Sequence, residues 1–102
     1  MRNETFKERV HAIVKKIPKG KVLSYGQVAL SAGYPGAARA VGTLMAQNHD
    51  KTVPCHRVVR ASGYIGEYNG GGPSAKIKRL RSEGVLISGE RVHRECILTP
   101  HV

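Results

Sequence analysis

The chain has 102 residues, and its 17 Lys and Arg residues against 7 Asp and Glu give a formal net charge of +10. This length favours one domain, residues 1–102, and no apolar run approaches the roughly 20 residues of a membrane-spanning helix. Two cysteines make no disulfide framework and match no zinc motif, so we expect neither a metal nor another cofactor. The positive charge favours a nucleic-acid partner, because neutralised phosphates release counterions; a basic protein that is merely soluble is the alternative.

The first predicted element is a helix that begins near Phe6. Apolar residues recur at helical spacing on one face as far as Ile17. Thr5 and Glu8 have the spacing of a capping box at its start, and Pro18 ends it.

A helix-turn-helix pattern follows. Ser24 and Gln27 have capping-box spacing at the start of a second helix, and Gly33 suits the left-handed position after its last turn. A third helix is predicted from about Ala37 to Gln47. Two short helices across a Gly-containing turn are typical of this motif, although many helical domains contain such a pair without binding DNA.

The third helix consists largely of small residues, with one long cation, Arg39, among them. Gly42 costs roughly 1 kcal/mol relative to Ala in a helix interior, so its presence needs a reason. Such a face can approach a groove closely, or it can pack tightly against another helix, and composition leaves both open.

The segment Pro54–Val59 sets a thiol directly before an imidazole and a guanidinium. Cysteine is a strong nucleophile as the thiolate, which nearby cations favour. The alternative is a buried cysteine that only packs. Cys96, beside Ile97 and Leu98, is expected to be structural.

A Gly-rich loop from Tyr64 to Gly72 lacks the spacing of a phosphate loop, and it either borders a cleft or is simply flexible. Ser74 is predicted to cap a last helix that stops at Gly84. Its basic residues are expected to form a mostly solvated face: Lys76, Lys78, Arg79 and Arg81. Residues 85–87 and 92–98 predict a small hairpin.

These segments together resemble the O6-alkylguanine-DNA alkyltransferases (methylated-DNA–protein-cysteine methyltransferases), with Pro54–Val59 as the active-site signature. The other matches follow the family's order at near-family spacing, from about Phe6 to Gly84: Gly20–Val22 with Ser24 and Tyr25, Ala38–Gly42 with Met45 and Asn48, Gly66 and Tyr68–Gly71, and Glu83-Gly84. The resemblance implies the family's C-terminal domain, a mainly α, winged-helix-like helix-turn-helix fold. The family commonly carries an N-terminal domain of different fold, which is expected to be absent here, either naturally or because the chain is a fragment.

The resemblance implies direct DNA repair, in which the protein moves an alkyl group from guanine O6 onto its own cysteine and is consumed. The lesion lies inside a duplex, so the nucleotide must be flipped out. The implied partner is double-stranded DNA, bound from the minor groove. We expect a monomer with no membrane partner. No signal region follows the N-terminus, so we expect it in the cytoplasm, or in the nucleus of a eukaryote.

Five residues receive catalytic roles from the resemblance. Cys55 is the nucleophile. His56 is the base and acts through water, because adjacent side chains generally point apart, and Glu83 holds its other ring nitrogen. Asn48 fixes the backbone around the active-site turn, and Tyr25 protonates or hydrogen-bonds N3 of the departing guanine. The alternatives are a packing role for Tyr25 and a solvated helix end for Glu83.

Six further residues are implied to contact DNA or the lesion: Arg39, Ala38, Met45, Val58, Tyr68 and Asn69. Arg39 fills the space of the flipped base, with Ala38 and Met45 on the same helix. The backbone carbonyls of Cys55 and Val58 accept hydrogen bonds from the guanine 2-amino group. Arg57 is structural.

Tyr68 forms a wall of the pocket in this comparison, and Asn69 stands where the family has serine. The change keeps a backbone amide for O6 but loses a hydroxyl contact. Glu67 adds a negative charge near the DNA. Both departures bear on which alkyl groups are accepted.

Three other classes of protein compete with this interpretation. An alkyltransferase-like lesion sensor has the same fold but lacks the reactive cysteine, so Cys55 argues against it. An ordinary helix-turn-helix regulator leaves Pro54–Val59 and Glu83 unexplained. A thiol-redox protein needs a second cysteine near Cys55 in sequence, and there is none.

Overall fold

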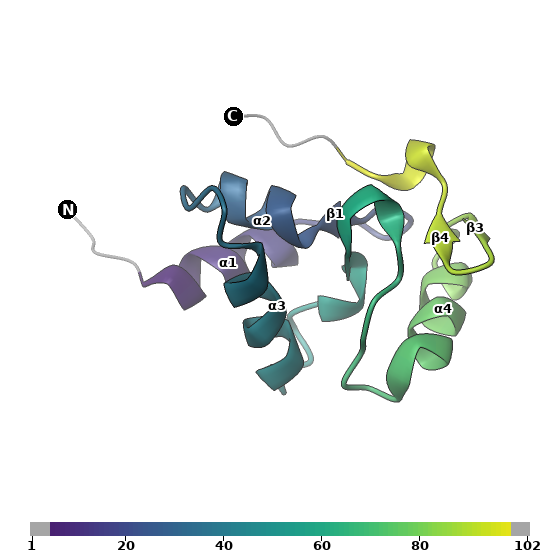
Figure 1. The fold of residues 1–102 in the computed structure, drawn as a ribbon. Helices are drawn as coiled ribbons and strands as arrows, with labels where there is room; N and C mark the ends of the chain where they lie inside the picture. The colour runs from purple at the N-terminus through teal and green to yellow at the C-terminus, as the bar shows by residue number, and fades with distance from the viewer. Residues whose placement is uncertain (1–4, 99–102) are drawn as a thin grey trace.

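The computed structural model describes residues 5–98 as a mainly helical domain with a small hairpin (Figure 1). The helices are α1 (Phe6–Lys15), α2 (Tyr25–Ser31), α3 (Ala38–Gln47) and α4 (Gly72–Ser82). The strands are β1 (Leu23–Ser24), β2 (Val58–Val59), β3 (Ile87–Ser88) and β4 (Arg91–Val92). The predicted fold class is confirmed. No helix in this part of the chain has the length and apolar character to cross a membrane.

The two capping boxes predicted before α1 and α2 are both present. At α2 the Ser24 hydroxyl accepts from the Gln27 backbone N–H at 3.1 Å, and the Gln27 side chain accepts from the Ser24 N–H at 2.9 Å. Thr5 and Glu8 make the same reciprocal pair at α1. Gly33 follows α2 with a φ of +89°, which a glycine adopts without strain. Both ends of α2 are therefore set by local chemistry, whereas no side chain caps the start of α3 and its buried residues pack with those of α2 in one core.

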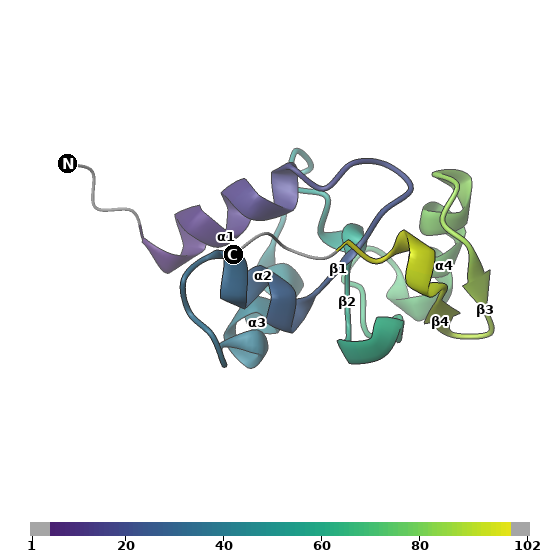
Figure 2. The same cartoon turned by 90° about the horizontal axis from the view of Figure 1, so that it is seen from above.

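A short parallel pair of strands links two halves of the molecule. Figures 1 and 2 show α1, α2 and α3 grouped at one end, α4 with the β3–β4 hairpin at the other, and β1 between them. β1 pairs with β2 in the register Leu23 to Val58 and Ser24 to Val59. Because neighbouring strand residues face opposite sides, Val58 packs into the core of the first half and Val59 into that of the second.

Two expectations about α4 are wrong. The helix begins at Gly72, after Gly71 with a φ of +128°, so Ser74 lies inside it and no side chain caps it. Pro73 occupies the first turn, where its fixed φ favours helix initiation. Lys76 does not lie on a solvated face, because only 1% of this residue is exposed. Lys78, Arg79 and Arg81 are exposed.

Candidate functional site

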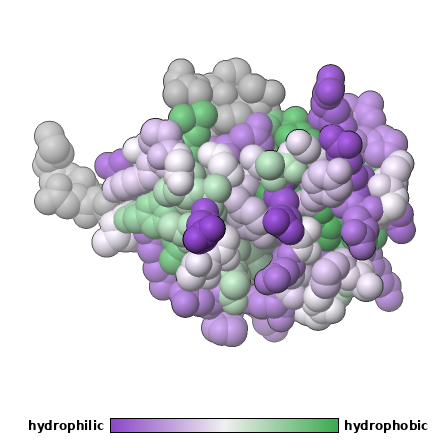
Figure 3. All heavy atoms as spheres, in the orientation of Figure 1, coloured by the Kyte–Doolittle hydropathy of each residue, from purple (hydrophilic) through white to green (hydrophobic). Residues whose placement is uncertain are grey.

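A pocket of about 940 Å³ opens between the helix-turn-helix and the Gly-rich loop. Weakly apolar surface gathers over the helix-turn-helix side of this face of the molecule, interrupted by strongly hydrophilic side chains (Figure 3). Seven of the predicted site residues line the pocket: Tyr25, Ala38, Arg39, Met45, Cys55, Tyr68 and Asn69. His56, Asn48, Val58 and Glu83 lie behind its wall.

Cys55 begins a 3-10 turn that presents its thiol at the pocket. The turn spans Cys55–Arg57 and directly follows Pro54, whose carbonyl accepts from the Arg57 N–H at 2.9 Å. The Cys55 residue is half-buried and unpaired with the other cysteine. Its Sγ lies 3.9 Å from Oδ1 of Asn69. The thiol is thus accessible from the pocket while its backbone is held.

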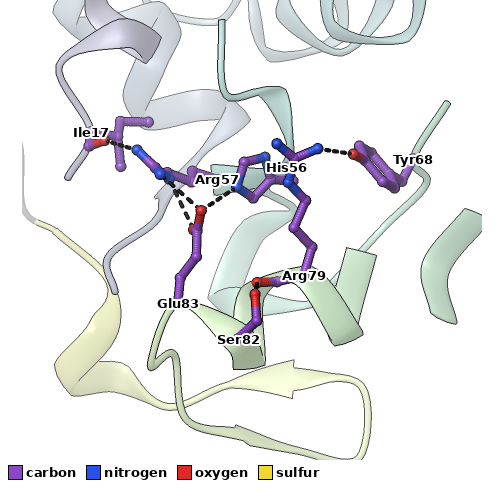
Figure 4. Close-up of polar contacts among 7 residues, drawn as sticks. All are labelled: Ile17, His56, Arg57, Tyr68, Arg79, Ser82 and Glu83. Carbon is purple, nitrogen blue, oxygen red and sulfur yellow. Dashed lines mark hydrogen bonds and ion pairs between the residues drawn. The ribbon is translucent and has the colours of Figure 1, made fainter. Parts of the chain in front are cut away.

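A buried ionic cluster supports this turn from behind (Figure 4). Glu83, the residue at the C-terminal end of α4, accepts from Arg57 at 3.0 Å and 2.8 Å, one bond to each carboxylate oxygen. Its Oε2 also lies 3.0 Å from His56 Nε2. Arg57 donates a third bond to the Ile17 carbonyl at 2.7 Å. The cluster therefore ties the turn to α4 and to the segment after α1.

The cluster keeps the carboxylate charged and the imidazole neutral at neutral pH. Burial raises the pKa of Glu83, but hydrogen bonds from Arg57 and His56 outweigh it and hold the pKa at about 2. Burial lowers the pKa of His56, and the attraction of Glu83 offsets this only partly. A neutral His56 must carry its proton on Nε2 to donate to the carboxylate, so Nδ1 is left as the basic nitrogen.

Within residues 5–98 no hydrogen bond joins the Cys55 thiol to the His56 ring, in keeping with neighbouring side chains that point apart.

Tyr68 lies edge-on to the His56 ring, with 6.5 Å between the two ring centroids. Its hydroxyl accepts from Arg79 at 3.0 Å. Arg79, although exposed, is therefore anchored to the pocket wall and not only solvated (Figure 4).

Tyr25 is the first residue of α2 and projects into the pocket. Burial raises the pKa of its phenol, and the charges of Cys55 and Glu67 act in the same direction. The hydroxyl therefore stays protonated at neutral pH and can donate a hydrogen bond to a group in the pocket.

Asn48 ends α3 and organises the turn that leads to Cys55. Its Nδ2 donates to the carbonyls of Asp50 at 3.1 Å and Val53 at 3.4 Å, and its Oδ1 accepts from the Asp50 N–H at 3.1 Å. With only 9% of the residue exposed, these bonds satisfy an amide that burial would otherwise penalise.

The small residues of α3 line open space. A Cβ atom built on Gly42 would meet no described atom within 4 Å, so this glycine makes no tight helix–helix contact. Arg39 is exposed and borders the pocket together with Ala38, while Met45 is 4% exposed and lies against its floor. The face is available for close approach by a partner. The Val58 side chain is fully buried in the core.

Lys76 is a site residue that sequence reasoning missed. Its Nζ donates to the carbonyls of Ile65 at 2.6 Å and Glu67 at 3.1 Å, and lies 5.7 Å from the centroid of the Tyr25 ring. It thereby fixes the loop that forms one pocket wall. The signal was present, because Lys76 precedes the fully buried Leu80 by four residues and so shares its helix face.

Lys76 is expected to make the unsubstituted protein more stable as the pH rises from neutral to alkaline values, and Lys76→Met is expected to lack this increase. Burial lowers the pKa of Lys76 from 10.5 to about 8, against the opposing charge of Cys55. Between these values the unfolded chain binds more protons, so the free energy of unfolding rises with pH. From about pH 7.5 to about pH 10 Lys76 contributes a rise of about 2 kcal/mol in the unsubstituted protein, and Lys76→Met lacks this contribution. Urea denaturation at both pH values measures this; the same pH dependence in both proteins contradicts a buried ammonium.

Comparison with protein families gives a match over most of the chain. The model described as "6-O-methylguanine DNA methyltransferase, DNA binding domain" matches residues 5–85. The methylated-DNA–protein-cysteine methyltransferase of Mycolicibacterium paratuberculosis is 40% identical over 97% of this chain and 56% of that protein. The Rattus norvegicus protein of the same name is 46% identical over 72% of this chain and 35% of that protein. The chain thus spans about half or less of these relatives' length.

Solved structures with the same fold include three complexes with DNA, and two of them illustrate the similarity. Schizosaccharomyces pombe Atl1, in complex with damaged DNA containing O6-carboxymethylguanine, aligns with a TM-score of 0.83 and 34% identity, over 98% of this chain and 100% of that chain. Mycobacterium tuberculosis OGT in complex with DNA aligns with a TM-score of 0.72 and 43% identity, over 80% of this chain and 51% of that chain.

Proposed function

Because residues 5–85 match its family model, this chain belongs to the 6-O-methylguanine DNA methyltransferase family, and on that premise we propose that it repairs DNA by moving an alkyl group from guanine O6 onto Cys55. The observation that carries the proposal is a half-buried thiol in a pocket beside the helix-turn-helix, with a neutral imidazole and an ionised carboxylate behind it.

Double-stranded DNA is the proposed partner, approached by α3 from the minor groove. The net charge of +10 supplies the attraction to phosphates. The open face at Gly42 allows close approach, and exposed Arg39 beside the pocket is suited to fill the space of a flipped nucleotide. A volume of about 940 Å³ is sufficient for one extruded base with its alkyl group. Two structural relatives were crystallised with DNA.

The proposed reaction is one displacement. The Cys55 sulfur bonds to the alkyl carbon, the bond from that carbon to O6 breaks, and its electron pair stays with guanine. The thiol proton passes to His56 Nδ1 through water and is then returned through solvent to the departing guanine, whose N3 accepts a hydrogen bond from the Tyr25 hydroxyl. Thiol and O6-alkylguanine thus become thioether and guanine. Because nothing restores the thiol, each molecule reacts once.

Lesion sensing without transfer is the second candidate. It is favoured by the high structural similarity to S. pombe Atl1, which was solved with O6-carboxymethylguanine DNA. A sensor needs the pocket and the helix-turn-helix but not a nucleophile, so Cys55 at the pocket wall favours transfer.

Analysis of the DNA after incubation distinguishes alkyl transfer from lesion sensing. A duplex that contains a single O6-methylguanine is incubated with excess protein, and its nucleosides are then quantified beside those of an undamaged duplex. Transfer predicts that O6-methylguanine disappears and guanine replaces it in equal amount. A preference for the damaged duplex with intact O6-methylguanine supports the sensor, and no preference with no conversion refutes both.

A further inference from the structure

The side chain of Asn69 connects two walls of the pocket beside the thiol. Asn69 belongs to the loop before α4, and its Nδ2 donates to the carbonyls of Asn48 at 2.7 Å and Ala46 at 3.1 Å, both at the end of α3. Its Oδ1 lies 3.9 Å from the Cys55 sulfur. One amide therefore extends from the loop to the helix, next to the reacting atom.

Both ends of this connection are held. Both protons of the Asn69 amide are used by the two carbonyls, and Asn48 is fixed in turn by its own bonds to Val53 and Asp50. On the loop side, the Tyr68 carbonyl accepts from the Gly72 N–H at 2.8 Å. Gly70, which follows Asn69, packs closely against the Tyr68 ring, because a Cβ atom on Gly70 would lie 2.5 Å from that ring. The Asn69 side chain therefore cannot move away without breaking these bonds.

We propose that Asn69 is a specificity-determining residue that limits transfer to small alkyl groups, an inference that rests on the transfer function proposed above. In the displacement the alkyl carbon must lie between guanine O6 and the Cys55 sulfur. A methyl group needs no further room. The remaining atoms of a larger group extend sideways from the line between O6 and the sulfur, and on the side toward the end of α3 the Asn69 amide lies beside the sulfur and limits that space. A serine or alanine side chain is too short to reach both carbonyls from the same backbone position.

The test compares two substrates in four proteins. Single-turnover rates are measured with duplexes that carry O6-methylguanine or O6-benzylguanine, for the unsubstituted protein, Asn69→Ser, Asn69→Ala and Gln47→Ala. Gln47 is the matched control, because it is an exposed amide at the end of α3 that does not line the pocket. Thermal unfolding of each protein checks folding, and the methyl rate is the internal reference for each variant.

The expected result is a benzyl-to-methyl rate ratio about tenfold higher in both Asn69 variants, because two hydrogen bonds no longer oppose the larger group, with no change in Gln47→Ala. An unchanged ratio, or methyl and benzyl rates that fall together, overturns the role of Asn69 and leaves the transfer function intact. An unsubstituted protein that takes benzyl as fast as methyl overturns it too. No methyl transfer by the unsubstituted protein overturns both the transfer function and this inference.

Discussion

Replacing Cys55 with alanine is expected to abolish alkyl transfer while lesion binding stays within about a factor of three, a difference of less than about 1 kcal/mol. The thiol is the one nucleophile on the pocket wall that the proposed displacement uses. The proposed DNA contacts come instead from α3, Arg39 and the basic surface. Transfer is measured by nucleoside analysis, and binding by fluorescence anisotropy with damaged and undamaged duplexes. Retained transfer by Cys55→Ala would disprove the assignment of the nucleophile.

The second cysteine provides a matched control. Cys96 is 5% exposed, packs in the core between α4 and the hairpin, and its sulfur accepts from the Leu86 N–H at 3.5 Å. Cys96→Ala should lower stability by about 1 kcal/mol through the lost packing, with the transfer rate unchanged. If Cys96→Ala lost transfer as completely as Cys55→Ala, a general role of cysteine in folding would explain both results.

Glu83→Gln is expected to lower the free energy of unfolding at neutral pH by about 3 kcal/mol, because Arg57 is left as a largely buried charge without its partner. The side chains of Arg57 and Glu83 are 13% and 10% exposed, so water does not compensate for the lost pair. The variant should also transfer more slowly, since His56 loses the carboxylate that orients its ring. Urea denaturation gives the first effect and single-turnover kinetics the second.

The pH dependence of this loss has a defined sign. The pKa of Glu83 is about 2 in the folded protein, against an ordinary value of 4.5. The carboxylate therefore stabilises the fold fully above about pH 4.5, and this contribution is lost as the pH falls toward 2. The difference between Glu83→Gln and the unsubstituted protein should shrink across that window. A constant difference would indicate that the substitution acts through packing and not through charge.

The start of α1 and both ends of α2 were predictable because their determinants are local. Capping boxes join residues three apart, and the glycine after α2 needs only its own φ. Local patterns did not predict the pocket. Its residues were predicted instead from the order and spacing of the segments that contain Asn48, Cys55 and Glu83, which resemble those of a known family. Sequence separation explains why. Arg57 bonds to the Ile17 carbonyl 40 residues away and to Glu83 26 residues away, and no local pattern encodes such a pairing.

The start of α4 illustrates how a local rule failed. Ser74 has the chemistry of a capping residue, but the chain reverses at Gly71 and Pro73 starts the helix before it. Asn69 illustrates a role that the sequence did not indicate: its side chain donates to two carbonyls at the end of α3. The Asn69 side chain contacts the end of α3 and the Cys55 turn, and these contacts are visible only in the folded chain.

The most direct measurement of the central claim is the intact mass of the protein after reaction with O6-methylguanine DNA. Transfer predicts a gain of one methyl group per molecule, found after proteolysis on the peptide that carries Cys55, with no second gain when fresh substrate is added. An unchanged mass, under conditions where the damaged duplex is bound, would contradict transfer and leave the protein as a binder of the lesion.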